Sequence, residues 1–391
     1  MVEKNNKTDV VANEQLLRQL LVEEKIESFR EYFLEIHPYD RAQFYERIGA
    51  EQRQILYRFL SPGEMADVFE AIDLEDDEYE EYLSEMDTSY VAAMLGFMYT
   101  DDAVDVLNEL DEDQRESYLE MMDTETVQEI NELLAYPEYT AGAIMTTEYV
   151  SITELSTVRS AMAVLRKKAP DAETIYYLFV VNDMHQLTGV LSLRDLIISD
   201  EDCLVRDIMS ERVVSVNVSE DQEAVAHIIK DYNFLAIPVI SDEKELLGII
   251  TVDDIIDVID EEAEDDYSKL AGISDMDDND LGPINAAKKR LPWLIILLFL
   301  GMLTSSLMGL FEDTLDKVAL LATFIPLISG TSGNSGTQAL AVSVRGIATG
   351  EIGKQSKFKL IIREISTGLI MGLISGAVVV GIIYVWKHEL I

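Results

Sequence analysis

The sequence predicts a multidomain protein made of an all-α superhelical N-terminal domain, a pair of small α/β modules and an α-helical transmembrane bundle. Three observations predict this architecture. Residues from about 13 to 135 repeat short amphipathic segments without strand-like alternation, residues 141–259 contain a duplicated βαβ pattern, and long uncharged stretches follow residue 290. The length of 391 residues is sufficient for two or three domains with buried cores.

The N-terminal domain, residues 1–138, is predicted to consist of stacked helical hairpins. The segment LLRQLLVEEKIESFREYFLEI places apolar residues three and four apart, and RAQFYERIGAEQRQILYRFL repeats the pattern. Turn-forming residues separate the repeats, as in a helical superhelix. Four aspartates stand out because two of them share one helical face, although helix capping and solubility are the simpler explanation from the sequence alone. They are Asp67, Asp101, Asp102 and Asp105.

Residues 139–260 are predicted to form two α/β halves, 139–202 and 203–260. The repeat is about sixty residues long, which is too long for a solenoid and suits paired modules. The two copies align at matching positions, Met145 with Met209 and Gly189 with Gly248.

Each half carries a hydroxyl and a carboxylate three residues apart at a strand-to-helix junction. Ser192 precedes Asp195 in the first half, and Thr251 precedes Asp254 in the second. Such a pair can hold a phosphate at the helix N-terminus and a ribose diol on the aspartate. The same pair is also an ordinary capping box, an explanation that is weaker for two copies in matching positions than for one.

The stretch DDIIDVIDEEAEDD, residues 253–266, carries nine carboxylates and no Lys or Arg. Its apolar residues recur at helical spacing, so we predict an amphipathic connecting helix and linker over residues 253–290. Carboxylates one turn apart on such a helix repel each other by roughly 0.2–0.5 kcal/mol per pair. A solvated acidic face would explain the run alone. Its position between a soluble module and membrane spans favours a response to divalent cations.

The charge distribution disfavours several classes of function. Of the 74 acidic residues, 68 lie in the first 290 positions, together with only 23 of the 30 Lys and Arg residues. This excess disfavours nucleic acid as a partner and favours cations. The single Cys203 and four scattered His residues provide no soft-metal site. The sequence contains no P-loop, G-x-S-x-G or H-E-x-x-H motif, so we predict that the protein is not an enzyme.

Three stretches are long and apolar enough to cross a bilayer, at about 291–311, 318–344 and 363–386 within the region 291–391. Lys and Arg crowd the segment before the first span and the connection between the second and third, whereas a mostly acidic loop joins the first two. The positive-inside rule therefore predicts a multi-pass protein of the cell membrane with its N-terminal domains in the cytoplasm. The absence of a signal-peptide core at the N-terminus agrees with this orientation.

The second span is unusually polar for a lipid-facing helix. Its sequence FIPLISGTSGNSGTQALAVSVRG places hydroxyl and amide side chains at membrane depth, including those of Asn334 and Thr337. Such groups are costly against lipid, so we expect them to face other helices or a water-filled path. Pro326 and the glycines permit either close helix packing or a broken helix.

Several motifs resemble known families. The duplicated modules resemble a CBS-domain pair, in which the cleft between the halves often binds adenosine nucleotides. The whole chain resembles the MgtE-type magnesium transporter family in its order of helical domain, CBS pair, acidic connecting helix and pore. The motifs that carry this resemblance are YPEYTAGAIMTTEYV, PDAETIYYLFVV, GVLSLRDLI, GIITVDDIIDVIDEEAEDD, PWLIILLFLGMLTSS and GTSGNSGTQALAVSVRG.

The resemblance implies a homodimeric Mg²⁺ channel or transporter in which cytoplasmic acids bind Mg²⁺ and the connecting helix then holds the pore shut, with ATP as a further regulator. The residues that match the Mg²⁺-sensing positions of the family are Asp67, Asp101, Asp105, Glu223, Asp254, Asp257, Glu262, Asp265 and Asp266. Those that match its nucleotide contacts are Tyr177, Arg194, Asp195 and Phe234, and Asn334 and Thr337 are expected to line the pore. Asn233 stands where the family can have an acid.

The pore of the family has five membrane helices, whereas three spans are predicted for this sequence, with no carboxylate at membrane depth. We therefore expect a chain that lacks the last two membrane helices. An alternative function is a membrane-anchored CBS-pair sensor of adenine nucleotides or divalent cations without transport activity. The missing helices favour this alternative, and the polar second span disfavours it.

Overall fold

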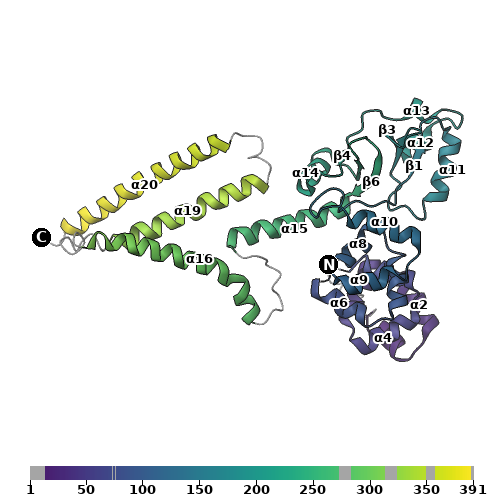
Figure 1. Ribbon diagram of the computed structural model, residues 1–391, viewed down its shortest axis with the longest axis horizontal. Helices are drawn as coiled ribbons and strands as arrows, with labels where there is room; N and C mark the ends of the chain where they lie inside the picture. The colour runs from purple at the N-terminus through teal and green to yellow at the C-terminus, as the bar shows by residue number, and fades with distance from the viewer. Residues whose placement is uncertain are drawn as a thin grey trace, which may run out of the picture. The chain divides into compact units, whose positions relative to one another are not determined.

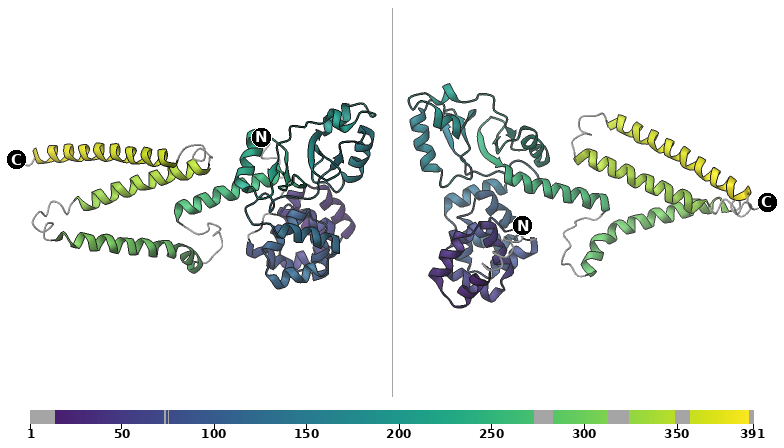
Figure 2. Two further views of the ribbon diagram at one scale, coloured as in Figure 1. Left: turned by 45° about the horizontal axis from the view of Figure 1, so that its top comes forward. Right: turned by 180° about the vertical axis from the view of Figure 1, so that it is seen from behind.

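The computed structural model describes residues 14–72, 74, 76–272, 283–312, 324–348 and 357–388. The chain divides into two units, Met1–Val258 and Ile259–Ile391. The first unit contains the N-terminal helices and both sheets, and the second contains the long apolar helices. Figure 1 labels most of their elements, and Figure 2 shows the same elements from two other sides.

The N-terminal part of the first unit is all α, as predicted. After a helical stretch at 14–22, its short helices are α2 (Ile26–Glu35), α3 (Pro38–Arg47), α4 (Ala50–Phe59), α5 (Pro62–Phe69), α6 (Asp76–Ser84), α7 (Thr88–Leu95), α8 (Thr100–Asn108), α9 (Glu112–Leu119) and α10 (Thr124–Leu134). Alternate helices pack together, α3 with α5, α5 with α7, α7 with α9 and α8 with α10. This is the arrangement expected of stacked helical hairpins.

Local sequence explains where these helices begin and what they bury. Ser61 and Glu64 form a complete capping box at the start of α5. Asp123 accepts hydrogen bonds from two backbone amides at the start of α10. On the inner face, Phe29 and Phe33 of α2 are fully buried and stack with ring centroids 5.2 Å apart.

The α/β part of the first unit contains two three-stranded sheets of identical topology. In each sheet a short strand pairs in parallel with a second strand, which pairs antiparallel with a third. The first half comprises β1 (Ser151–Thr153), α11 (Val158–Lys168), β2 (Tyr177–Val181), β3 (Leu187–Ser192) and α12 (Leu193–Ile198). The second comprises α13 (Val205–Ile208), β4 (Val216–Asn217), α14 (Gln222–Tyr232), β5 (Ala236–Ile240) and β6 (Leu246–Thr251).

The two halves exchange their entry segments. Thr146 precedes β1 of the first half, yet its backbone exchanges two hydrogen bonds of 2.8 and 3.0 Å with Ile249 of β6 in the second half. In the same way, Ser210, which precedes β4 of the second half, exchanges bonds of 3.0 and 2.9 Å with Val190 of β3 in the first half. The halves therefore depend on each other for their backbone pairing.

The acidic connecting segment is helical, as predicted, and forms α15 (Val252–Ala271). Ile255 and Val258 are buried, at 1% and 5% exposure, and belong to the main core of the first unit. Ile256 and Ile259 are 55% and 40% exposed. The buried stripe is thus narrower than the four apolar residues suggested. Residues 273–282 of the predicted linker lie outside the described residues.

The second unit contains the long helices α16 (Pro283–Gly309), α19 (Ile325–Ala348) and α20 (Lys357–His388). Among the described residues, two segments have the length and hydropathy of a membrane span, Ala286–Gly309 and Phe358–Val385. Residues 318–323 of the second predicted span lie outside the described residues.

Helix α19 has 24 residues and is unbroken despite its Pro and glycines. At 1.5 Å per residue it is about 36 Å long, which is enough to cross a bilayer core. Thr331 and Thr337 donate their hydroxyl protons to carbonyl oxygens one turn earlier, Leu327 and Gly333, at 2.8 and 3.2 Å. The structure therefore has the continuous helix and not the broken one.

Candidate metal centre

Three carboxylates from distant parts of the first unit meet at one point. Asp101 lies in the first turn of α8, Glu173 lies between α11 and β2, and Asp254 lies in the first turn of α15. Each offers one oxygen, and these oxygens all lie within 4.8 Å of one another. We refer to these three residues as the carboxylate cluster. It joins the N-terminal helices, the first α/β half and the start of the connecting helix.

Local structure holds each member in place. Thr251 holds Asp254, whose Oδ2 accepts the Thr251 hydroxyl at 2.6 Å and the Thr251 amide at 3.2 Å. The backbone amide of Glu173 donates to the carbonyl oxygen of Glu148 at 3.0 Å. Asp101 is only 6% exposed because α8 is packed into the core on this side.

Two oxygens of the cluster are buried without a hydrogen-bond partner among the described residues, Asp101 Oδ1 and Glu173 Oε2. A buried carboxylate oxygen that accepts no hydrogen bond costs free energy, typically more than 1–3 kcal/mol when the group is charged. Such an arrangement is unfavourable for the protein alone. It becomes favourable when a cation lies between the oxygens.

The electrostatics of the cluster are those of mutual repulsion. Burial raises the pKa of Asp101 well above its usual value, and the nearby charges of Asp102 and Asp254 raise it further. Burial followed by the charge of Asp254 raises the pKa of Glu173 to about 8. The pKa of Asp254 is also raised by burial, against the opposing effect of its bonds to Thr251.

The repulsion extends to neighbouring acids. Burial raises the pKa of Asp102 to about 8, with contributions from Glu70, Asp254 and Asp105 in that order. Burial likewise raises the pKa of Glu70, whose carboxylate accepts a hydrogen bond from the amide of Tyr99 at 3.0 Å. The charged groups responsible for all of these shifts are acids. A cation bound here would therefore replace protons and remove the repulsion.

The donor set fits a hard divalent cation. Carboxylate oxygens suit Mg²⁺, which keeps several waters and takes one or two carboxylates directly. In an octahedral shell with bonds of about 2.1 Å, ligand oxygens lie about 3 to 4.2 Å apart. The oxygens of the cluster lie within 4.8 Å of one another, and this limit is not far above the range. Small side-chain adjustments or bridging waters would complete such a shell.

The structure brings together only some of the predicted metal residues. Asp101 and Asp254 both belong to the cluster. Asp105 and Asp257 lie about one turn further along α8 and α15, and both are exposed. Their charges contribute to the raised pKa values of Asp102 and Asp254 respectively.

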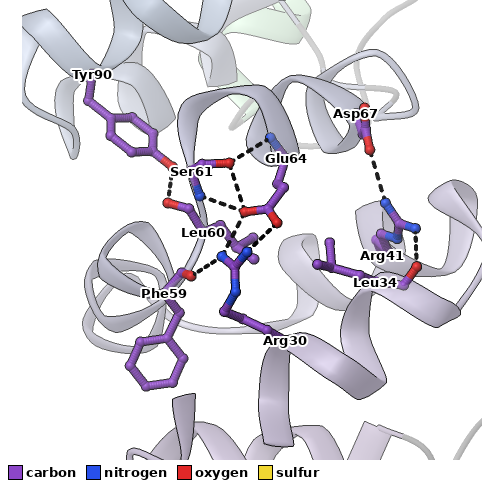
Figure 3. Close-up of polar contacts among 9 residues, drawn as sticks. All are labelled: Arg30, Leu34, Arg41, Phe59, Leu60, Ser61, Glu64, Asp67 and Tyr90. Atoms are coloured by element: carbon purple, nitrogen blue, oxygen red, sulfur yellow. Dashed lines mark hydrogen bonds and ion pairs between the residues drawn. The ribbon is translucent and has the colours of Figure 1, made fainter. Parts of the chain in front are cut away.

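Asp67 instead takes part in an ion pair within the N-terminal domain. Its carboxylate lies 3.2 Å from the guanidinium of Arg41, as Figure 3 shows. The same guanidinium donates to the carbonyl oxygen of Leu34 at 2.6 Å, so its position is fixed by the backbone. Arg41 is buried whereas Asp67 is half-exposed, and this pairing could not be read from the sequence.

The remaining predicted metal residues lie elsewhere. Glu223, in the first turn of α14, is 3.9 Å from His227 on the same helix. Glu262, Asp265 and Asp266 lie on the part of α15 that belongs to the second unit, where Asp265 forms an ion pair with Lys269.

Sequence reasoning missed Glu173 as a member of the cluster. This residue lies in the motif PDAETIYYLFVV, which carried the family resemblance, but no residue nearby in sequence marks it as a ligand. Its role depends on contacts with α8 and α15, which are more than seventy residues away along the chain. Its neighbours Asp171, Ala172 and Thr174 show neither helical nor strand periodicity.

Of the predicted nucleotide residues, Tyr177 is the one that packs against residues of both halves. Tyr177 pairs with Ser192 across β2 and β3, and the Ser192 hydroxyl donates to Asp195 at 2.6 Å. Tyr177 also packs against a small core that contains residues from both halves, including Ala236. Phe234, two residues before Ala236, stacks on Tyr232 with centroids 5.3 Å apart. Arg194 lies on α12 beside Asp195.

Asn233 has a structural role at the place where the family can have an acid. It ends α14 in the left-handed conformation, with φ 55° and ψ 44°. Asn tolerates this conformation better than most other residues because its short polar side chain can bond locally.

The predicted pore residues Asn334 and Thr337 both lie on α19, three residues apart and therefore on neighbouring positions of one helical face. Both are exposed in the second unit.

Family comparisons cover most of the chain. Residues 36–139 match the MgtE intracellular N domain, residues 141–201 and 205–261 each match the CBS domain, and residues 325–391 match the model described as a divalent cation transporter. These matches define a membrane transport protein whose remaining part combines a helical domain with a CBS pair.

Curated relatives identify the family. The chain is 52% identical to the magnesium transporter MgtE of Enterococcus faecalis over 376 residues, which are 96% of this chain and 83% of the relative. It is 38% identical to that of Bacillus subtilis over 368 residues, 94% of this chain and 81% of the relative. This chain belongs to the MgtE family of magnesium transporters. The relatives are transporters, which confirms the prediction that the chain is not an enzyme.

Two solved structures resemble the first unit and confirm the predicted fold class. The soluble part of a magnesium transporter matches with a TM-score of 0.64 and 52% identity, and covers 65% of this chain and 99% of its own. The cytosolic domain of the Mg²⁺ channel MgtE in complex with ATP matches with a TM-score of 0.58 and 38% identity, and covers 62% and 98%.

Proposed function

We propose that this chain is a Mg²⁺ channel or transporter of the cell membrane whose opening is controlled by Mg²⁺ bound at the carboxylate cluster. The observation that carries this proposal is the pair of buried, unpartnered oxygens on Asp101 and Glu173 beside Asp254. The names of the curated relatives support Mg²⁺ as the transported ion. The transported ion and the regulatory ion are thus the same, which provides feedback.

The cluster can act as a switch because its three members belong to different segments. Without a cation, repulsion among the acids opposes the packing of α8 against the start of α15 and the loop that carries Glu173. A bound Mg²⁺ cancels this repulsion and favours the packed state. A ligand that binds one of two states more tightly shifts the population toward that state. We propose that the packed state is the closed one.

Further Mg²⁺ ions would bind the remaining predicted acids, which are Asp67, Asp105, Glu223, Asp257, Glu262, Asp265 and Asp266. For Asp67, Mg²⁺ would have to compete with Arg41. The connecting segment, residues 253–290, would transmit the packed state to the membrane helices. Asn334 and Thr337 of α19 would line the path of the ion.

We further propose that the chain acts as a homodimer with several spans and with its N-terminal domains in the cytoplasm. This orientation exposes the cluster to cytoplasmic Mg²⁺. ATP is proposed as a modulator that binds near Tyr177, Arg194, Asp195 and Phe234, with support from the ATP complex of the 38% identical cytosolic domain. The proposed boundaries are those of the sequence analysis, with domains at 1–138, 139–260 and 291–391.

Flux measurements on the full chain in liposomes test the proposal. Mg²⁺ uptake should fall as Mg²⁺ on the side of the soluble domains rises into the millimolar range. Asp101→Asn, Glu173→Gln and Asp254→Asn should keep the flux high at the same concentration, whereas the control Asp195→Asn should behave as the wild type. Inhibition that survives in all three cluster variants would refute gating at this site. Mg²⁺-dependent stabilisation without any flux would favour the alternative of a membrane-anchored sensor.

A further inference from the structure

Glu148 lies beside the carboxylate cluster but has a different environment from its members. Its Oε1 accepts the hydroxyl proton of Thr100 at 2.5 Å. Its Oε2 accepts the hydroxyl of Thr146 at 2.6 Å and the amide and hydroxyl of Thr147 at 3.1 and 3.4 Å. Both oxygens are thus occupied by neutral donors. In the cluster, by contrast, Asp101 Oδ1 and Glu173 Oε2 accept no hydrogen bond from the described residues.

Glu148 reaches all three segments that carry the cluster. Thr100, which it binds through its side chain, immediately precedes Asp101 in α8 and is 5% exposed. Its own carbonyl oxygen accepts the backbone amide of Glu173 at 3.0 Å. Its neighbour Thr146 is fully buried and exchanges two backbone hydrogen bonds with Ile249 of β6. Strand β6 then leads directly into the cap that holds Asp254.

The bond between Thr100 and Glu148 also crosses between two domains. Thr100 belongs to the N-terminal helices, whereas Glu148 belongs to the entry segment of the CBS pair. The hydroxyls of Thr100 and Thr147 lie 3.2 Å apart as well, so the contact contains more than one polar link. Hydrogen bonds to a charged acceptor are stronger than those between neutral groups.

We infer that Glu148 is a positioning residue of the cation site: through Thr100 it fixes Asp101, and through its backbone it fixes Glu173, so that the cluster is assembled before the ion arrives. This inference rests on the proposed function of the cluster. Three acids that repel each other need a separate contact to hold them at ligand distance. A carboxylate saturated by hydroxyl donors provides that contact without neutralising the cluster and without contributing a ligand.

A double-mutant cycle tests the inference. The variants are Thr100→Val, Glu148→Gln and the double variant of the full chain in detergent. Thermal unfolding is followed while MgCl₂ is titrated, and also in EDTA. Each single variant should raise the Mg²⁺ concentration at half-maximal stabilisation by about tenfold, as expected for the loss of a hydrogen bond to a charged group. The double variant should be no worse than the single ones, and Thr100→Ser should restore the wild-type midpoint.

Thr126→Val is the matched control. Thr126 donates its hydroxyl to Asp123 at 2.8 Å at the start of α10, so this variant also loses a hydroxyl-to-carboxylate bond, but one within the N-terminal domain. It should lower the unfolding temperature in EDTA and leave the Mg²⁺ midpoint unchanged. A variant that only loosens the fold would behave like this control.

Three outcomes would overturn the inference. A wild-type Mg²⁺ midpoint in Thr100→Val would show that the interdomain bond does not position the cluster. A further loss of Mg²⁺ affinity on adding Glu148→Gln to Thr100→Val would show that the Glu148 side chain does not act on the site through Thr100. An equal shift of the Mg²⁺ midpoint in Thr126→Val would show that the shift comes from a general loss of stability and not from the cluster. If the wild-type chain showed no Mg²⁺ response at all, the proposed function itself would fail, which is a separate result.

Discussion

The two halves of the α/β pair carry the same local motif and use it differently. Ser192 donates to Asp195 at 2.6 Å, and Thr251 donates to Asp254 at 2.6 Å. Asp195 is exposed at the start of α12. Asp254 is half-buried, with Asp101 and Glu173 beside it.

This difference shows that the motif determines a conformation and the surroundings determine its chemistry. In both halves the hydroxyl of the residue before the helix donates to the carboxylate and fixes it relative to its own helix. Only in the second half do other acids converge on the same carboxylate. The duplicated motif therefore leaves its carboxylate exposed in the first half and places it beside two other carboxylates in the second. This is why we propose a nucleotide contact for Asp195 and a cation contact for Asp254.

Replacing the aspartate of the motif by asparagine in each half tests most directly whether Asp195 and Asp254 have different roles. Asp254→Asn should raise the Mg²⁺ concentration needed for thermal stabilisation by at least tenfold, because a ligand charge is lost from the cluster. Asp195→Asn should leave the Mg²⁺ response intact and weaken stabilisation by ATP. Titration of both variants with each ligand checks this. Equal losses of the Mg²⁺ response in the two variants would contradict the division of roles.

The pH dependence of stability should next distinguish the carboxylate cluster from the exposed Asp195. Asp102 and Glu173 have folded-state pKa values of about 8, above their ordinary values of 3.8 and 4.5. The folded chain therefore holds protons that the unfolded chain releases, and stability falls as pH rises from about 5 through 8.

Without divalent cation, the unfolding temperature of the full chain should drop by several degrees between pH 6 and pH 9. Saturating Mg²⁺ should remove most of that drop because the ion replaces the protons. Glu173→Gln should flatten the slope in EDTA, whereas Asp195→Asn should retain it. Calorimetry at fixed ionic strength measures these differences, and a slope unchanged by Glu173→Gln would count against the cluster as its source.

Substitution of the two aligned glycines, Gly189 and Gly248, should give the smallest difference between the halves, measured as lost stability. A Cβ at Gly248 would lie 2.6 Å from the backbone oxygen of Thr146, whereas a Cβ at Gly189 would first meet the flexible Met209 Sδ, at 2.5 Å. Gly248→Ala must therefore move backbone and should cost about 1–3 kcal/mol, more than Gly189→Ala, in which a side chain can adjust.

Urea denaturation of the two glycine variants compares these costs. Gly248→Ala should also weaken the Mg²⁺ response, since Thr146 belongs to the segment that carries Glu148. Gly189→Ala should not. Equal costs would contradict the prediction, because they would mean that the backbone of Thr146 can move away from residue 248 as easily as the Met209 side chain moves away from residue 189.

The type of structure in each region, whether all-helical, α/β or apolar helix, could be predicted from the sequence alone. Helical spacing, the sixty-residue repeat and the apolar stretches are periodic along the chain, and each depends on residues a few positions apart. For the same reason the hydroxyl–carboxylate pairs at Ser192 and Thr251 could be recognised. The resemblance of six motifs then placed Asp101 and Asp254 among the candidate metal residues.

Which acidic side chains lie close together depends on the tertiary structure. Glu173 joins Asp101 and Asp254 because a loop, a helix start and a second helix start converge in the fold, and no spacing in the sequence encodes that convergence. Asp67, which looked equivalent to Asp101, is paired with Arg41. Coulombic energy and burial depend on distances in space, so the acids that repel each other, and would gather an ion, become visible only when the chain is folded.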